Sequence, residues 1–446
     1  MAFEFPPINE AGSYRSLRFV NSLAANDICP IVITFAIDDN LLKTKKNIDY
    51  GLMELIHPEV QIIRLSLDDI NKLVKTKLHK FIYKFNNIIG DNFLDIINKQ
   101  NIKLIEDLIS KEKPAAIITS CPPFSSSVLC SKLSKKYKIP LILDFRDAWS
   151  EWCMVPYPSR LHYLMRKGLE KKILKSASAI ISVTPELIDK YQKAHPGITK
   201  NKFKLIFNST SFILKEGELI LLKPLEMDRH INIGYTGSFY YEPLIQNEKM
   251  IWNKIKHIHR LLRYYPVKED WLYRSPHFFL KTLSNLFYKN SNLRSNIYFH
   301  HIGETPGWLK SMIAENNLDR NVIVHGYQNL ENVLKLEKEF DLLLATSEKV
   351  IGNEHYCLPS KLFTYLKAKK PILAFVTDGI QKKFLENTNL GIFCNPDDIE
   401  NSTLIIENCI KSGVEKKINA EYLNKFSDQN CNKEFVDIIS NILNGN

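Results

Sequence analysis

The sequence predicts an α/β protein made of two doubly wound parallel sheets, and three observations support this. Short β-branched apolar runs, each closed by a polar, Pro or Gly turn, alternate with helical patterns along most of the chain. Such runs are typical of strands that are buried on both faces. The alternation weakens at about 208–228 and then restarts. The length of 446 residues suits two large domains or about three average ones.

The first half is expected to form an N-terminal domain over residues 1–215. Its expected strands are 31–35, 61–65, 116–119, 140–144, 179–183 and 204–207, and its expected helices are 12–26, 71–89, 126–137 and 160–176. Strands that alternate with helices form parallel sheets. The opening stub Ala2–Phe5 is short for a central strand.

The second half is expected to form a similar domain over residues 228–415. Its expected strands are 231–237, 297–302, 322–325, 341–345, 371–375 and 391–394. The stretch 240–290 is rich in aromatic and basic residues and is interpreted as an insertion, and residues 416–446 are expected to be C-terminal helices. Two such domains facing a cleft would bind ligands at the carboxyl ends of their strands.

Composition excludes several classes of protein. A hydrophobic fraction of 45% excludes general disorder. No run of about 18 apolar residues and no signal peptide is visible, so we expect a cytoplasmic protein. Eight Cys without a CxxC pair predict reduced thiols and no metal site. The net charge of +11 leaves nucleic acid, a membrane surface and an anionic substrate open.

Polar motifs follow the strands of the first domain. Gly12 and Ser13 begin a helix whose free N–H groups suit an anion, and Arg15 adds charge; a plain N-capped loop is the alternative. Arg146 and Asp147 follow a buried strand that ends at Asp144. Buried charges are costly unless paired, so they form either a structural Arg146–Asp salt bridge or a substrate contact.

Small and basic residues follow the strands of the second domain. Thr236 and Gly237 allow the backbone to approach a diphosphate closely. Pro359 and Ser360 begin a helix whose free amides can hold phosphate, and Lys361 adds a positive charge.

Taken in order, these motifs resemble those of bacterial glycosyltransferases of the two-Rossmann GT-B fold, family 4 type. The matching segments are Pro6–Pro7, Gly12–Arg15, Pro122–Ser125, Asp144–Asp147, Tyr235–Gly237, His301–Gly303 and Leu358–Phe363. The resemblance implies transfer of a sugar from a UDP- or GDP-linked donor to a glycan or polyprenyl-linked acceptor. It also implies retention of configuration, with neither a metal nor another cofactor.

The resemblance places the donor against the second domain and the acceptor against the first, near Gly12 and Ser125. The catalytic candidates are Arg146, Asp147 and Lys361, and the candidate binding residues are Gly12, Ser13, Thr236, Gly237, His325, Gly326, Glu354, Pro359, Ser360, Lys361 and Thr364. Cations and helix N-termini stabilise the charge that a leaving diphosphate gains.

The sequence departs from the family at its usual Glu-x7-Glu pair. Thr364 stands at the second Glu, Tyr356 at the first, and Glu354 is out of register. A degenerate non-catalytic partner subunit and a GT-B nucleotide-sugar epimerase therefore remain alternatives.

Part of the positive charge falls on the segment 71–89, a basic amphipathic pattern with five Lys opposite an apolar face. It predicts either a core-packed helix with a solvated face or docking on the anionic inner face of the plasma membrane. The aromatic residues of 255–290, including Trp271, Phe278 and Phe279, are a second candidate contact. Nucleic acid is not expected as a partner, because no recognised module appears.

Overall fold

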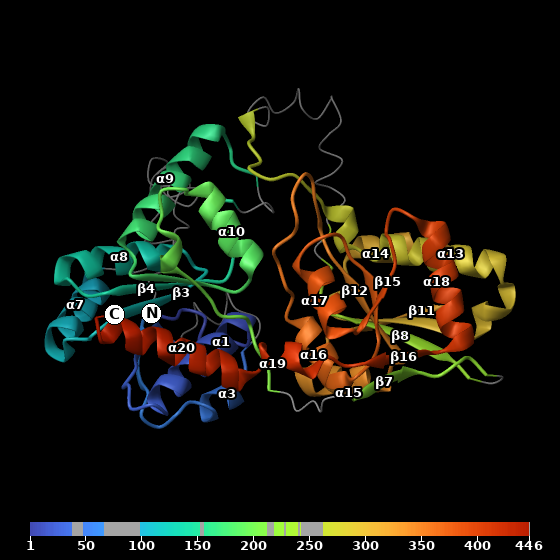
Figure 1. Ribbon diagram of the computed structural model, residues 1–446, viewed down its shortest axis with the longest axis horizontal. Helices are drawn as coiled ribbons and strands as arrows, with labels where there is room; N and C mark the ends of the chain where they lie inside the picture. Colours follow the sequence, from blue (N-terminus) through green and yellow to red (C-terminus); the bar gives the residue numbers. More distant parts are fainter. Residues whose placement is uncertain are drawn as a thin grey trace. The chain divides into compact units, whose positions relative to one another are not determined.

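The computed structural model describes residues 1–37, 48–66, 99–151, 156–211, 218–226, 229–239, 241 and 262–445. The expected helix 71–89 lies outside the described residues. The chain divides into two compact units (Figure 1). Unit 1 comprises residues 1–209, 259–266 and 428–446, and unit 2 comprises 210–258 and 267–427.

The sheets of unit 1 are parallel. β3 (Ile117–Cys121), β4 (Leu141–Phe145), β5 (Ala179–Ser182) and β6 (Phe203–Leu205) pair in that order, and β1 (Ile31–Phe35) pairs with β2 (Gln61–Leu65). Every residue of β4 is buried, as its continuous apolar run predicts.

The opening stub joins the two sheets of unit 1. Ala2 N donates to Ile33 O at 3.1 Å, and Ser120 N donates to Met1 O at 3.2 Å. The stub therefore lies between β1 and β3 and brings Glu4 to the carboxyl side of the sheet, next to β4.

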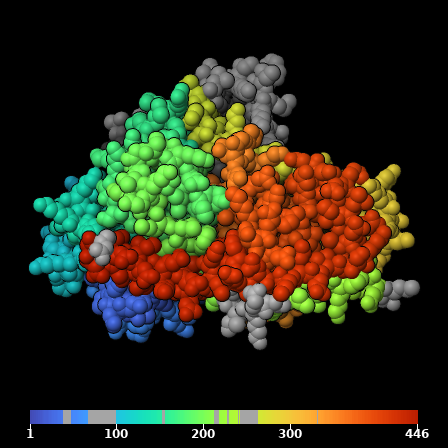
Figure 2. Space-filling view, viewed as in Figure 1, coloured from blue at the N-terminus to red at the C-terminus, as the bar shows by residue number. Residues whose placement is uncertain are grey.

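Helices flank these strands, and the last of them comes from the C-terminal end of the chain. The helices are α1 (Ala11–Ala24), α3 (Gly51–Glu54), α7 (Lys99–Glu112), α8 (Ser125–Tyr137), α9 (Arg160–Ser176), α10 (Pro185–Ala194) and α20 (Asp428–Leu443), with the short 3-10 turn η1 (Lys200–Lys202). α20 packs against α1, where Phe435 stacks on Phe19 with ring centroids 3.8 Å apart. Figure 2 shows this C-terminal segment, in red, running across the face of unit 1.

Unit 2 contains a six-stranded parallel sheet in the order β11-β10-β8-β12-β14-β15. The strands are β8 (Ile231–Thr236), β10 (Ile297–Ile302), β11 (Val322–Gly326), β12 (Leu342–Thr346), β14 (Ile372–Phe375) and β15 (Gly391–Phe393). The order reverses between β8 and β12, and the carboxyl ends of strands at such a switch point form the usual ligand crevice of open α/β sheets.

Two antiparallel pairs and a set of helices complete unit 2. β7 (Leu219–Leu222) pairs with β16 (Val414–Lys417), and β9 (Glu269–Asp270) pairs with β13 (Lys349–Val350). The helices are α13 (His277–Lys289), α14 (Gly307–Glu315), α15 (Leu330–Glu339), α16 (Lys361–Ala368), α17 (Ile380–Thr388), α18 (Ile399–Ser412) and α19 (Ala420–Asn424), with 3-10 turns η3 (Trp271–Arg274) and η4 (Ser291–Ser295).

One expectation about the 240–290 insertion was wrong. Residues 277–289 form α13, which crosses from β8 to β10 and buries Phe279, Leu280, Leu283 and Leu286 completely in the core of unit 2. Phe279 therefore cannot contact a membrane. The apolar residues of α13 itself serve core packing, which the sequence alone does not distinguish from a membrane contact.

The fold class predicted from the sequence is confirmed, and the elements lie close to where the patterns placed them. β1, β2, β10 and α9 begin and end at the predicted residues. The two helices found after residue 416 belong to different units: α19 is part of unit 2 and α20 is part of unit 1.

We expect Phe435→Ala to lower the free energy of unfolding of unit 1 by about 3–5 kcal/mol, the usual cost of a cavity left by a core phenylalanine. Phe435 is 1% exposed and packs on Phe19. Urea unfolding measures the change. Leu443→Ala, on an exposed residue of the same helix, is the control and should change the free energy by less than about 1 kcal/mol. Equal losses in both variants would contradict this packing.

Candidate functional site

A buried ion pair lies at the carboxyl end of β4 in unit 1. Arg15 Nη2 lies 2.8 Å from Asp144 Oδ1, and the two side chains are 2% and 1% exposed. Ser120 Oγ also donates to Asp144, at 2.8 Å, and Arg15 Nη1 donates to Phe207 O at 3.0 Å. The expectation that Arg15 adds charge to an anion site was therefore wrong, because its charge is neutralised inside the unit.

Arg146 has a different partner from the one expected. Its Nη2 lies 2.7 Å from Glu4 Oε2 and 2.8 Å from Pro122 O, and its Nε donates to Cys121 O at 3.2 Å. The pair is with Glu4 of the opening stub, not with a neighbouring Asp. Burial alone would lower the pKa of Arg146, but the carboxylates of Glu4 and Asp144 outweigh it and raise the pKa. Arg146 therefore remains charged.

The N-terminus of α1 meets this pair. A Cβ atom on Gly12 would lie 1.9 Å from Arg146 Nη1 and 1.9 Å from Glu4 Oε2, so only glycine fits there. The Ser13 side chain is completely buried, and its hydroxyl makes no hydrogen bond to a described residue. The structure thus brings Gly12, Arg146 and Glu4 together at the start of α1.

The serine hydroxyls that follow β3 form hydrogen bonds within the turn. Ser126 Oγ donates to Pro123 O at 2.7 Å, and Ser127 Oγ donates to Phe124 O at 2.6 Å. Ser125, Ser126 and Ser127 are all at most 1% exposed. The hydroxyls of Ser126 and Ser127 therefore bind the turn itself, and the burial of Ser125 argues against direct contact between its side chain and an acceptor.

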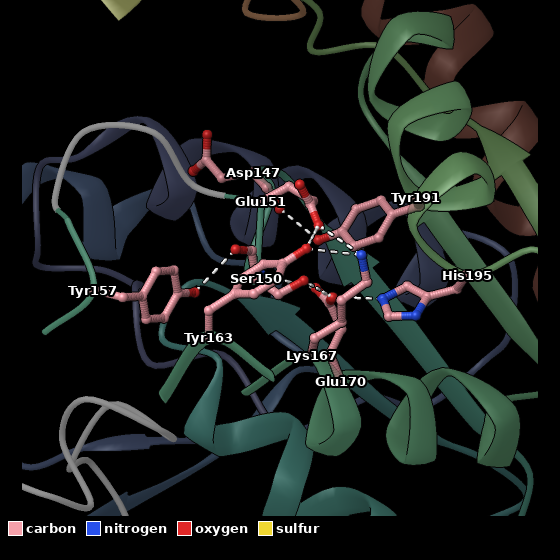
Figure 3. Close-up of polar contacts among 9 residues, drawn as sticks. All are labelled: Asp147, Ser150, Glu151, Tyr157, Tyr163, Lys167, Glu170, Tyr191 and His195. Carbon is pink, nitrogen blue, oxygen red and sulfur yellow. Dashed lines mark hydrogen bonds and ion pairs between the residues drawn. The ribbon is translucent and has the colours of Figure 1, made fainter. Parts of the chain in front are cut away.

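A buried polar network holds the loop that carries Asp147 (Figure 3). Glu170 of α9 accepts hydrogen bonds from Ser150 N at 3.1 Å and from Ser150 Oγ, and His195 Nε2 lies 2.6 Å from Glu170 Oε2. Tyr191 Oη donates to Asp147 O at 2.8 Å. Figure 3 shows the half-buried Asp147 carboxyl group pointing away from this network.

No pattern in the sequence indicates this network. Ser150, Glu170 and His195 are at most 1% exposed, and they come from a loop, a helix and the end of α10. A fixed loop backbone is what a positioned Asp147 requires, because catalytic groups act only from a defined geometry.

In unit 2, β8 and β10 end in two touching glycine turns. Gly237 has φ 101° and Gly303 has φ 151°, and a Cβ on Gly303 would lie 2.6 Å from Gly237 O. His301 Nε2 donates to the same Gly237 oxygen at 3.2 Å. Burial lowers the pKa of His301 to about 4, so the imidazole is neutral at pH 7. The conformation of the Gly237 turn is thereby fixed.

Lys361 points its ammonium group at this turn from the start of α16. A Cβ on Gly237 would lie 3.4 Å from Lys361 Nζ, and Nζ lies 3.6 Å from the centre of the Tyr235 ring. Burial lowers the pKa of Lys361 to about 7, against the opposing effect of Glu337. The cation is therefore held beside the turn with incomplete compensation of its charge.

Glu337 of α15 is a residue that the sequence analysis missed. Its side chain is completely buried, and Oε1 lies 2.8 Å from Thr236 Oγ1 and 3.0 Å from Thr364 Oγ1. Oε2 makes no hydrogen bond to a described residue. Burial raises the pKa of Glu337 to about 7. A carboxylate thus lies against Thr364, where the family resemblance expects a glutamate, but it comes from another helix.

The remaining expected residues lie at the ends of other strands or in loops. His325 Nε2 lies 2.9 Å from His300 Nδ1, and burial lowers the pKa of both, that of His300 to about 4. Gly326 has φ 69°, and its carbonyl accepts from Gly303 N at 2.9 Å. His325 and Gly326 therefore adjoin the glycine turns.

Glu354 lies elsewhere in unit 2. It is exposed, its Oε2 lies 2.6 Å from Lys383 Nζ, and it lines a shallow depression with Asp378 and Lys382. Lys361 does not line this depression. Pro359 and Ser360 precede α16, and Ser360 makes no side-chain cap. The amides of Leu362 and Phe363 donate to Pro359 O at 3.1 Å and to Ser360 O at 3.0 Å, so the expectation of free amides at this helix start was wrong for these two.

Within the described residues, no group of three or more His, Cys, Asp or Glu has an arrangement able to hold a metal ion. In the same part of the chain, no helix is both long and apolar enough to span a bilayer.

Comparison with known proteins identifies the fold. No family model and no curated protein sequence matches the chain. The chain is similar to the apo form of the lipopolysaccharide outer core galactosyltransferase WaaB, at TM-score 0.54 and 12% identity over 98% of this chain and 97% of the other. The chain is also similar to sucrose-phosphate synthase from Thermosynechococcus elongatus, at TM-score 0.53 and 14% identity over 96% of this chain and 89% of the other.

A third structure, WaaG, a glycosyltransferase involved in lipopolysaccharide biosynthesis, gives TM-score 0.51 and 12% identity over 99% of this chain and 98% of the other. The similarity to all three extends over nearly the whole chain. The predicted GT-B fold of two Rossmann-like domains is therefore confirmed.

We expect stability to fall between about pH 5 and about pH 7 because of Glu337. Its pKa is raised in the folded state from 4.5 to about 7, so the folded chain binds this proton more tightly, and that stabilisation is lost as the pH rises through about 7. The loss is about 2 kcal/mol. It should disappear in Glu337→Gln, as measured by urea unfolding at both pH values.

Glu339→Gln is the matched control, because Glu339 is exposed on the same helix. It should keep the pH dependence of the wild type. A Glu337→Gln variant with an unchanged pH dependence would contradict the raised pKa.

Proposed function

We propose that this chain is a glycosyltransferase that moves a sugar from a nucleotide-sugar donor, UDP- or GDP-linked, to a glycan or polyprenyl-linked acceptor. The observation that carries the proposal is the Lys361 ammonium beside the Gly237 turn, at the switch point of the unit 2 sheet. A cation over a glycine turn at this position suits a diphosphate. The fold shared with WaaB and WaaG supports the same reaction class.

The proposed reaction depends on stabilising the negative charge that forms on the leaving group. When the bond between the sugar and the diphosphate breaks, negative charge accumulates on the leaving phosphate, and fixed positive groups stabilise it. The ammonium group of Lys361, beside the Gly237 turn, is such a group. Because the pKa of Lys361 is about 7 without a ligand, a bound diphosphate raises it and secures the charged form. No metal is required in this proposal, and configuration at the sugar is retained.

Unit 1 is proposed to bind the acceptor. Nη1 of Arg146 makes no hydrogen bond to a described residue and adjoins Gly12, while Nε and Nη2 are held by protein oxygens. This leaves two N–H donors for a ligand. Asp147, on its fixed loop, is proposed to orient the acceptor hydroxyl, and the leaving phosphate takes the proton. A peripheral location on an anionic membrane suits a lipid-linked acceptor.

A non-catalytic binding subunit is the second candidate, and Thr364 favours it. The residue that the family pattern requires as Glu is a threonine bound to a carboxylate that is completely buried and therefore does not reach a ligand. Binding of a nucleotide sugar without turnover of any acceptor would support this second candidate.

A panel of UDP-, GDP- and dTDP-sugars tests the proposal by thermal shift. We expect at least one to raise the melting temperature, and Lys361→Ala to weaken its binding about 10- to 100-fold, since a charge-assisted contact to phosphate is lost. Lys338→Ala, on an exposed residue of α15, is the control and should bind like the wild type. If no nucleotide sugar in the panel binds, the proposal fails.

Arg146→Ala should lower the turnover number about 100-fold or more while leaving the affinity for the donor within about threefold, because Arg146 lies in the acceptor unit. Steady-state kinetics with the donor found in the panel measure both quantities. Arg166→Ala, a basic residue of α9 in the same unit, is the control. A loss of donor affinity as large as the loss of turnover would place Arg146 at the donor instead.

A further inference from the structure

Helix α9 presents a straight stripe of exposed side chains, here called the α9 stripe. Its members recur at helical spacing and are Leu161, Leu164, Met165, Lys171, Lys172 and Lys175. The three apolar side chains are 64%, 51% and 39% exposed. Residues three and four apart share one face of a helix, so the stripe is a single surface, apolar in its N-terminal half and basic in its C-terminal half.

The opposite face of α9 holds the helix rigidly in unit 1. Tyr163, Glu170, Ile173 and Leu174 are buried there. Glu170 contributes most of the polar anchoring, through Ser150 and His195 (Figure 3). The stripe therefore cannot turn inward to bury its apolar residues without breaking this network, and it stays on the surface.

Among the residues that the structure describes, none neutralises the charge of the stripe. Neither Lys171, Lys172 nor Lys175 forms an ion pair with a described residue. Three adjacent exposed apolar side chains on one helix turn are unusual on a soluble surface and mark an interaction site. Three adjacent exposed lysines create a local positive potential that attracts anionic groups. An occupant that offers apolar and anionic groups side by side therefore complements the stripe.

We propose that the α9 stripe docks on the surface of an anionic lipid bilayer. Leu161, Leu164 and Met165 enter the boundary between head groups and acyl chains, and the three lysines lie against anionic head groups. A bilayer surface offers both chemistries at the required separation, whereas a protein partner would have to be built for them. The contact involves α9 alone and requires neither donor nor acceptor.

Binding to vesicles tests this. Full-length protein is sedimented with vesicles of phosphatidylcholine alone and with vesicles containing about one third phosphatidylglycerol. We expect binding to the anionic vesicles that weakens steeply with salt. Replacing Lys171, Lys172 and Lys175 with Ala should weaken it about 100-fold, since each lysine contributes on the order of fivefold. Replacing Leu161 and Leu164 with Ser should weaken it at least about tenfold.

A control variant distinguishes binding through the α9 stripe from nonspecific binding caused by the positive charge of the protein. Lys103, Lys132 and Lys135 are exposed in α7 and α8 of the same unit, and replacing all three with Ala removes the same charge. This triple variant should bind anionic vesicles within about threefold of the wild type. Circular dichroism checks that every variant is folded.

Three results would overturn the proposal: no binding to anionic vesicles, equal losses in the two lysine variants, or self-association that the Leu161→Ser, Leu164→Ser variant abolishes. The last result would show that a second copy of the chain covers the stripe. Because the assay contains no sugar, its failure leaves the proposed transfer reaction untouched, and failure of the nucleotide-sugar panel leaves this contact untouched.

Discussion

The buried ion pair between Arg15 and Asp144 fixes the geometry on which unit 1 depends. It joins α1 to the end of β4, and Ser120 and the Phe207 carbonyl complete its hydrogen bonds. A buried charge that loses its partner costs about 3–5 kcal/mol, so neither member can be replaced alone. Gly12 lies three residues before one partner and Arg146 two residues after the other, so the pair also sets the position of the site.

The two units differ in how charged side chains at their strand ends are paired. In unit 1 each buried arginine has a carboxylate within hydrogen-bond distance, and both pairs are closed. In unit 2, Glu337 is bound to two threonines rather than directly to Lys361, and both groups have pKa values of about 7. An anion beside the Gly237 turn would therefore raise the pKa of Lys361 and favour its charged form, whereas in unit 1 Nη1 of Arg146 makes no hydrogen bond to a described residue.

The sequence predicted the strands well because a strand buried on both faces is a short, mostly apolar run, and β1, β12 and β14 show this pattern clearly. It also predicted the glycines and cations at strand ends. It did not predict Glu4 or Glu337, since their partners lie 142 and 101 residues away along the chain. It misjudged Arg15 and Phe279, because residue type alone does not separate a buried group from an exposed one.

The return of α20 to unit 1 has a consequence for synthesis on the ribosome. The hydrophobic core that contains Phe19 is completed by Cys431, Phe435 and Ile439. At about 5–20 residues per second, Phe19 leaves the ribosome tens of seconds before its ring partner is made. Unit 2 lies wholly between these segments and has all its residues earlier. Unit 1 therefore completes this core only after all residues of unit 2 have been synthesised, and until then the apolar face of α1 lacks its α20 partner.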